Sequence, residues 1–206
     1  MNIIHPTAII GNNVSLEENV EIGPYCVIGD NVTICKNTKL FSHVVVGTIG
    51  EYPTRHTSKF TKFPKVLIGS NVIIREFVTI NSNVDDGETS VGDNCYLMTK
   101  SHIGHDSRLE NNVVLCSNSV VGGYSKINSY TYVGLNSSIH QRSIVGKHCI
   151  IGANSFFKGT SPDGITWVGV PSIPKKINFF NLEKNLKDKV ELELIVQHAK
   201  KFIDEF

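Results

Sequence analysis

Three histidines and an aspartate in the second half of the chain have types and spacing suited to proton transfer. His102, His105 and Asp106 lie in the stretch SHIGHDSRLENN, and His140 follows in SSIHQRSIVG. An imidazole near its ordinary pKa of ~6.5 can accept a proton at neutral pH, and an adjacent carboxylate can fix its tautomer. The group therefore suits general base catalysis, such as activation of a hydroxyl or amine that attacks a thioester. Either His102 or His105 could be that base.

A six-residue period predicts the elements that position these side chains. Aliphatic residues open successive hexads over 4–46, 68–80 and 91–151. Short apolar segments at this spacing cannot bury a face alone, so they stack as the coils of a parallel β-helix. Three hexads make one coil of 18 residues. We therefore expect an all-β domain over 1–178, with coils roughly 4.8 Å apart.

The 18-residue coil brings distant residues into columns. His105 falls in one column with Gly123 and Gln141, while Gly122 and His140 fall in the adjacent column. No side chain shields the backbone N–H of Gly123, so it could stabilise the oxyanion of a tetrahedral intermediate. These positions together offer what acyl transfer requires. The alternative is that the histidines are surface residues without a role.

Two interruptions of the register predict loops outside the prism. The first, about 48–66, mixes basic and aromatic residues, and the second, 84–90, is short and acidic. Insertions in solenoids commonly line binding sites, although either segment could be an ordinary surface loop. The segment GVPSIPKKI then reads as the turn that leaves the prism. Apolar residues at spacings of three and four predict one amphipathic helix over 179–206.

Composition limits the possible partners. The chain has 20 lysines and arginines against 19 aspartates and glutamates, so no overall basic field favours nucleic acid. No stretch approaches the roughly 20 apolar residues that span a bilayer, so we expect no stable membrane insertion. The N-terminus lacks the pattern of a secretory signal, and the five cysteines form no CxxC pair. These features favour a cytoplasmic protein.

Several motifs carry a family resemblance: HIGHD and the stretch that follows it to SSIHQ, IHPTAIIG near the start, VVVGTIGE before the first loop and IREFVTI after it. They resemble the UDP-N-acetylglucosamine O-acyltransferases of lipid A biosynthesis, among the hexapeptide-repeat acyltransferases. The resemblance implies a left-handed β-helix and a homotrimer with sites in the grooves between subunits. It also implies acyl-CoA or acyl carrier protein as donor, a nucleotide-linked sugar as acceptor, and no permanently bound cofactor.

The same resemblance assigns roles to single residues. It makes His105 the general base, Asp106 its support and Gly123 the oxyanion donor. Substrate-binding positions would be His102, Gly122, Tyr124, His140 and Gln141. At Tyr124 the family has a further active-site histidine. Near the end of the prism, Lys175 and Lys176 could bind the phosphates of the acyl carrier, or could be ordinary surface lysines.

Departures from the family concern the substrate. The family's Gln-Asp-x-Lys substrate loop should fall within 52–59, where this chain reads YPTRHTSK, and the helical region after the prism is shorter. The ending GVPSIPKKI is more similar to small hexapeptide acyltransferases that N-acylate amino sugars. We therefore expect acyl transfer to an amine or hydroxyl of a nucleotide-linked sugar, for surface polysaccharide or lipopolysaccharide synthesis. The lipid A O-acyltransferase itself is the alternative.

Two further readings belong to other functional classes. A γ-type carbonic anhydrase needs three histidine ligands for zinc, two of them five residues apart in that family, whereas His102 and His105 are three apart. We therefore expect no metal site. A non-catalytic scaffold is the other reading, since a fold alone does not give a function. A scaffold would not need the HIGHD cluster, so this cluster argues against the non-catalytic reading.

Overall fold

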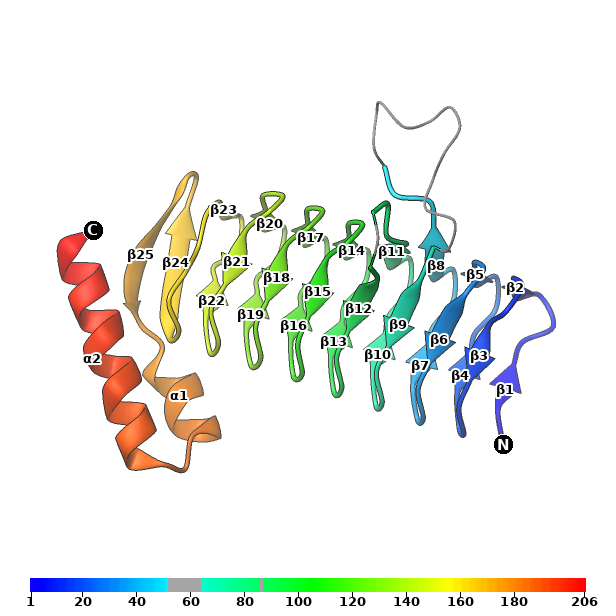
Figure 1. Ribbon diagram of the computed structural model, residues 1–206, viewed down its shortest axis with the longest axis horizontal. Helices are drawn as coiled ribbons and strands as arrows, with labels where there is room; N and C mark the ends of the chain where they lie inside the picture. Colours follow the sequence, from blue (N-terminus) through cyan, green and yellow to red (C-terminus); the bar gives the residue numbers. More distant parts are fainter. Residues whose placement is uncertain (52–63, 86) are drawn as a thin grey trace.

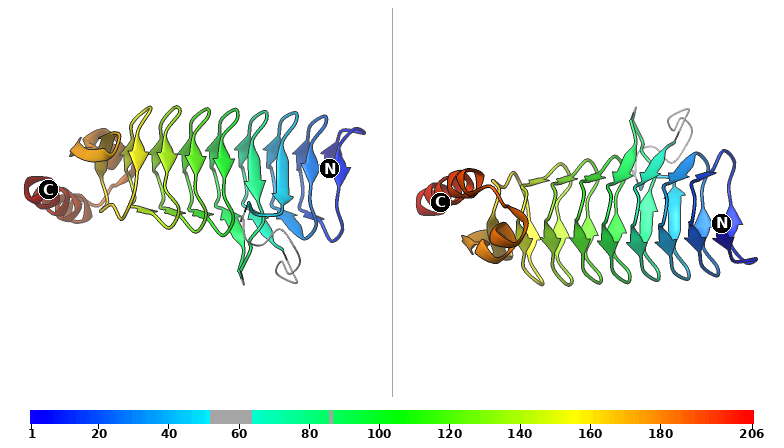
Figure 2. Two further views of the ribbon diagram at one scale, coloured as in Figure 1. Left: turned by 90° about the horizontal axis from the view of Figure 1, so that it is seen from above. Right: turned by 90° about the horizontal axis from the view of Figure 1, so that it is seen from below.

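The computed structural model describes residues 1–51, 64–85 and 87–206, and most of them form a three-sided prism of stacked coils (Figures 1 and 2). Successive coils are offset by 18 residues where no loop intervenes, as Ile3 pairs with Glu21 and Glu21 with Lys39. The coils pair through parallel strands along the whole prism. The predicted left-handed parallel β-helix is confirmed.

Three sheets form the sides of the prism. Sheet A contains β1 (Ile3–Ile4), β4 (Glu21–Ile22), β7 (Lys39–Leu40), β10 (Ile73–Ile74), β13 (Tyr96–Leu97), β16 (Val114–Leu115), β19 (Tyr132–Val133), β22 (Ile150–Ile151), β24 (Ile165–Gly169) and β25 (Ser172–Ile177). Sheet B contains β2 (Ile9–Ile10), β5 (Val27–Ile28), β8 (Val45–Thr48), β11 (Thr79–Asn81), β14 (His102–Ile103), β17 (Val120–Val121), β20 (Ser138–Ile139) and β23 (Phe156–Phe157). Sheet C contains β3 (Ser15–Leu16), β6 (Val32–Ile34), β9 (Val66–Ile68), β12 (Thr89–Val91), β15 (Arg108–Leu109), β18 (Lys126–Ile127) and β21 (Ile144–Val145).

One inward position on each side of a coil builds the core. The residues that open the predicted hexads are at most 2% exposed from Ile22 to Ile151. Burial of one such aliphatic side chain stabilises the fold by about 1.5–3 kcal/mol, so the stack of coils is held mainly by this column of apolar contacts. Ile4 and Ile10, in the first coil, remain 44% and 37% exposed because no coil covers them.

The corners of the prism place single residues in the left-handed backbone region, with φ near 60°. Asparagine is frequent there because its short polar side chain tolerates this conformation. In the corner between sheets C and A, Asn19, Asn37, Asn71 and Asn94 also bond to one another, Nδ2 to Oδ1, at 3.1–3.2 Å. We call these four residues the asparagine ladder.

The segment predicted as an exit turn is a strand. Residues Ser172–Ile177 form β25, which pairs antiparallel with β24 and extends sheet A at its end. The prediction of a turn was wrong for these residues, although the segment begins with the tight connection between β24 and β25. A proline is tolerated in an edge strand, where a missing N–H breaks no ladder.

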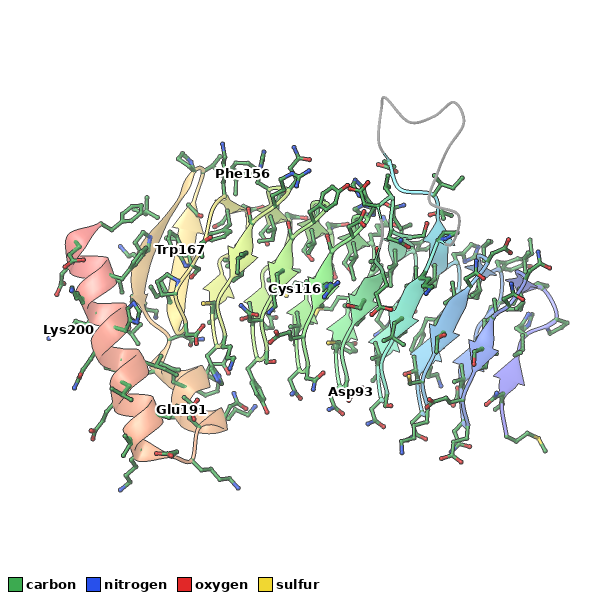
Figure 3. The ribbon with its side chains drawn as sticks, viewed as in Figure 1. Asp93, Cys116, Phe156, Trp167, Glu191 and Lys200 are labelled. Atoms are coloured by element: carbon green, nitrogen blue, oxygen red, sulfur yellow. The ribbon has the colours of Figure 1, made fainter. Side chains whose placement is uncertain are left out.

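The C-terminal region holds two helices where one was predicted: α1 (Phe179–Asn185) and α2 (Lys189–Glu205). Asp188 caps the N-terminus of α2, since its carboxylate accepts a hydrogen bond from the backbone N–H of Val190 at 2.8 Å. Trp167, labelled in Figure 3, packs between the prism and α2, with ring centroids 5.0 Å from Phe157 and 6.0 Å from Phe202. The helices therefore cover the end of the core. None in the described part of the chain is long and apolar enough to cross a membrane.

Candidate active site

The HIGHD motif lies at the corner where the chain passes from β14 in sheet B to β15 in sheet C. The same corner of the next two coils carries Tyr124 and Arg142, with Asp106, Tyr124 and Arg142 at φ 58°, 60° and 63°. The 18-residue columns predicted from the sequence are confirmed here, because Tyr124 N donates to His105 O and Arg142 N to Gly123 O, each at 2.9 Å.

His105 and Asp106 form a buried pair. The Nδ1 atom of His105 lies 2.8 Å from Oδ2 of Asp106, and the two side chains are only 8% and 9% exposed. An ionised carboxylate can only accept a hydrogen bond, so this contact places the imidazole proton on Nδ1. The basic lone pair then belongs to Nε2, as a general base requires.

The second break in the repeat holds the carboxylate of Asp106. Its Oδ2 accepts from the backbone N–H of Val84 at 2.9 Å, and its Oδ1 lies 3.4 Å from the N of Asp85. The backbone N–H of Asp106 donates to Oγ1 of Thr89 at 2.8 Å. The orientation of Asp106, and through it of His105, thus depends on this inserted segment.

Two glycines make room for His105. A Cβ on Gly123 would lie 2.8 Å from Nε2 of His105, and a Cβ on Gly50 would lie 2.6 Å from its Cβ. Only glycine therefore fits at either position without displacing the imidazole. Gly123 is half-buried, and within the described residues its backbone N–H has no hydrogen-bond acceptor. A donor thus stands beside the basic nitrogen.

His102 lies in a different environment from His105. Its Nδ1 is 2.8 Å from Oγ1 of Thr79 on the neighbouring strand β11. Burial lowers the pKa of His102; Glu51 opposes this shift and His105 adds to it. His102 therefore stays neutral at pH 7 and has a hydroxyl partner in place of a carboxylate. Among the described residues, no group of three histidine, cysteine or acidic side chains could hold a metal ion.

His140 and Gln141 lie on the coil above Gly122 and Gly123. The Nδ1 atom of His140 lies 3.0 Å from the backbone oxygen of Gln141. The imidazole ring of His140 meets the ring of Phe156 edge-on, with centroids 5.9 Å apart. Gln141 is exposed, and its backbone N would lie 2.7 Å from a Cβ on Gly122. The predicted substrate-binding residues His140, Gln141 and Gly122 therefore share one patch beside the base.

Tyr124 packs against the imidazole of His105. The two rings meet edge-on, with centroids 4.9 Å apart and planes at 88°. The tyrosine hydroxyl lies 2.5 Å from Oδ2 of Asp85, and the guanidinium of Arg142 stands 4.3 Å from the centre of the tyrosine ring. The hydroxyl is thus engaged with the protein at the position that the sequence assigned to substrate binding.

The two lysines predicted to bind the acyl carrier lie elsewhere. Lys175 and Lys176 are exposed on β25, the last strand of sheet A, whereas His105 lies between sheets B and C. The coils of β17, β20 and β23 stand between β14 and that end of the prism. The predicted substrate loop, 52–59, falls outside the described residues.

Sequence reasoning missed Gly50, Val84, Asp85 and Thr89, although all four touch the His105–Asp106 pair or its partners. One signal could have linked the second break to the HIGHD motif. Eighteen residues before Asp106 is position 88, inside the interruption at 84–90. The interruption therefore replaces the part of the coil that lies directly beneath the motif.

A separate groove lies away from this chemistry. A cavity of about 560 Å³ separates α1 from the face of sheet A, with Tyr130, Tyr132, Phe180 and Lys184 among its walls. It presents no pairing of a base with a carboxylate support. We therefore take the His105 corner, and not this cavity, as the candidate active site.

Comparison with known proteins identifies similar chains. The family described as bacterial transferase hexapeptide (six repeats) matches residues 3–36, 13–48 and 88–123. The chain is similar to that family over these segments. A relative from Paraburkholderia phymatum, an acyl-[acyl-carrier-protein]–UDP-N-acetylglucosamine O-acyltransferase, is 47% identical over 135 residues, 58% of this chain and 52% of that protein. This hexapeptide-repeat chain thus spans about half the length of the curated relatives it matches.

Solved structures extend the likeness over nearly the whole hexapeptide-repeat chain. The UDP-N-acetylglucosamine acyltransferase of Francisella novicida is 28% identical with a TM-score of 0.81, covering 95% of this chain and 78% of that one. A perosamine N-acetyltransferase from Caulobacter crescentus, 17% identical with a TM-score of 0.55, covers 73% of this chain and 77% of that one and shares the fold alone.

Proposed function

We propose that the protein is an acyltransferase that moves an acyl group from acyl carrier protein to a hydroxyl of a UDP-N-acetylglucosamine-type nucleotide sugar. The observation that carries the proposal is the His105–Asp106 pair, which directs the basic Nε2 of His105 toward Gly123. The names of the relatives supply the donor and the acceptor. They support the lipid A type of O-acyltransferase better than the broader expectation of N- or O-acylation, with acyl-CoA as the other possible donor.

The proposed reaction uses His105 twice. Nε2 removes the proton of the acceptor hydroxyl while the oxygen attacks the thioester carbonyl, and Asp106 stabilises the imidazolium that forms. The N–H of Gly123 donates to the oxyanion of the tetrahedral intermediate. When the intermediate collapses, the C–S bond breaks and the imidazolium returns its proton to the leaving thiolate. The ester and the free thiol are the products, so the base is regenerated.

The neighbouring polar groups would bind the acceptor. His102 is neutral and half-buried, and His140 and Gln141 flank the glycine corner on the next coil. Neutral imidazoles and amides suit the hydroxyl and carbonyl groups of a sugar, because they bind them without a charge that must be desolvated. Binding of the carrier phosphates by Lys175 and Lys176 remains part of the proposal, supported only by their exposure and charge.

We also propose that the active molecule is a homotrimer whose sites lie between subunits. Val120, Tyr132 and Ile144 project from the sides of the prism and remain 39%, 38% and 42% exposed, which leaves apolar surface for a second copy. Light scattering after size exclusion should give about three times the 22.7 kDa of one chain. A cytoplasmic location belongs to the same proposal, supported by five cysteines that all stand unpaired.

A substrate panel tests the reaction. Purified protein is incubated with acyl carrier protein or coenzyme A thioesters of several chain lengths, and with nucleotide sugars that carry either a free hydroxyl or a free amine. Mass spectrometry should show an ester on UDP-N-acetylglucosamine formed from the carrier-protein donor. Acylation of amines alone would overturn the O-acyltransferase assignment, and no acyl product with any pair would overturn acyl transfer.

A further inference from the structure

Tyr124 is built into the site more deeply than a substrate contact requires. It follows the glycine corner in the column above Asp106, and its own N–H donates to His105 O at 2.9 Å. Its φ of 60° is the conformation of the coil corners in general, as at Tyr130. Its ring lies edge-on to His105 and beneath the Arg142 guanidinium. Two other side chains therefore contact the ring of Tyr124.

The hydroxyl of Tyr124 binds the carboxylate of Asp85 at 2.5 Å. Burial raises the pKa of Tyr124 well above its ordinary value, and the Asp85 hydrogen bond and the nearby carboxylates act in the same direction. The phenol therefore keeps its proton at neutral pH and donates it to Asp85. A hydrogen bond from a neutral donor to a charged acceptor is among the stronger kinds in proteins.

Asp85 belongs to the segment that orients the catalytic pair. The backbone N–H groups of Val84 and Asp85 point at the two carboxylate oxygens of Asp106, and Oδ2 of that carboxylate also accepts from His105. The contacts close a ring: Tyr124 binds Asp85, the segment at 84–85 binds Asp106, Asp106 binds His105, and His105 packs on Tyr124. Removing one link leaves Asp106 with fewer fixed donors.

We propose that the Tyr124–Asp85 hydrogen bond is a clasp that holds the 84–85 segment on Asp106 and thereby fixes the orientation of His105. Tyr124 is then a positioning residue in place of the substrate-binding one expected from the sequence. The consequence for turnover rests on the proposed function. The predicted loosening of the 84–85 segment does not rest on the proposed function, because the hydrogen bonds concerned lie within the protein.

Hydrogen exchange of the Val84 amide tests the clasp without any substrate. Tyr124→Phe removes the donor and Asp85→Ala removes the acceptor of this bond, and we expect the Val84 amide to exchange about tenfold faster in each, the loss of one hydrogen bond to a charged group. The double variant should exchange no faster than either single one. Tyr96→Phe is the matched control, since it removes a hydroxyl that accepts from Arg75 at 3.2 Å on sheet A. Unchanged Val84 exchange in both clasp variants would overturn the proposal.

Two further readouts separate the clasp from the proposed reaction. The Nδ1 proton of His105 should give a downfield proton resonance that broadens in Tyr124→Phe and stays sharp in Tyr96→Phe. In the acyl-transfer assay, kcat of Tyr124→Phe should fall about tenfold with little change in KM, because orientation of the base is lost while acceptor contacts remain. A sharp resonance and wild-type kcat would contradict the positioning role. If wild-type protein transfers no acyl group, the proposed function fails while exchange and resonance still decide the clasp.

Discussion

Two corners of the same prism use one backbone conformation for different purposes. In the asparagine ladder, residues such as Asn37 have φ near 58°, and their side chains form hydrogen bonds with one another. In the corner of the candidate site, Asp106, Tyr124 and Arg142 have φ between 58° and 63°, and their side chains turn to His105, to Asp85 and to each other. The coil geometry is therefore shared, and only the side chains differ.

The comparison shows where the chemistry comes from. The ladder is periodic, so Asn37 and Asn71 each bind an asparagine one coil above and another one coil below. The site corner interrupts that pattern, because the coil beneath Asp106 is replaced by the break at 84–90 and its backbone N–H groups bind the carboxylate. A regular scaffold thus gains a site where one corner residue becomes acidic and one loop departs from the register.

Asp106→Asn makes the site corner resemble the ladder, and we expect it to have the largest effect of three substitutions. Asparagine suits the left-handed conformation, so the fold should be kept. The amide no longer orders the proton on Nδ1 of His105 or stabilises the imidazolium, so kcat should fall about 10²–10⁴-fold. Steady-state kinetics with circular dichroism measures both effects. Wild-type kcat in a folded variant would show that Asp106 does not support the base.

Asn37→Ala damages the ladder and leaves the site corner intact. An alanine at φ 58° is strained by roughly 1–2 kcal/mol, and the bonds to Asn19 and Asn71 are lost. The free energy of unfolding in urea should fall by about that amount, with kcat unchanged. A loss of turnover without a loss of stability would mean that the two corners are not independent.

His148→Asn has the smallest expected effect and concerns pH. His148 continues the ladder column, is 2% exposed, and its pKa is lowered by burial. As pH falls through the ordinary value of about 6.5, the unfolded chain gains a proton that folded His148 resists, so stability falls with pH. The variant should lose less thermal stability than the wild type between pH 7.5 and 5. The pKa of His102 is lowered as well, so part of the pH dependence of stability should remain in the variant. An identical loss in both proteins would exclude His148 as a cause.

Most of the fold could be predicted because it is periodic. The six-residue register determines the inward residues, the columns and the stacking of the coils. An offset of 18 residues per coil therefore predicted that His105, Gly123 and Gln141 lie in one column. Segments outside the register were predicted less well. The strand β25 was taken for a turn because it lies beyond the six-residue register, and the helical region was taken for one helix although Asp188 has the type and position of a helix cap.

The site itself was predicted in part for the same reason. Side chains on regular coils have fixed neighbours, whereas Val84 and Asp85 lie in an insertion whose path depends on tertiary contacts with Asp106 and Tyr124. No period places such a loop. The choice between His102 and His105 also needed the structure or the family resemblance, because it depends on which imidazole meets a carboxylate.

The most direct test compares two histidines in the acyl-transfer assay. His105→Ala removes the proposed base, and His198→Ala removes an exposed imidazole on α2 as the matched control. With the donor and acceptor that the substrate panel identifies, kcat of His105→Ala should fall about 10²–10⁴-fold, the usual contribution of a general base, while His198→Ala should equal the wild type. Turnover of His105→Ala at the wild-type rate would contradict the account.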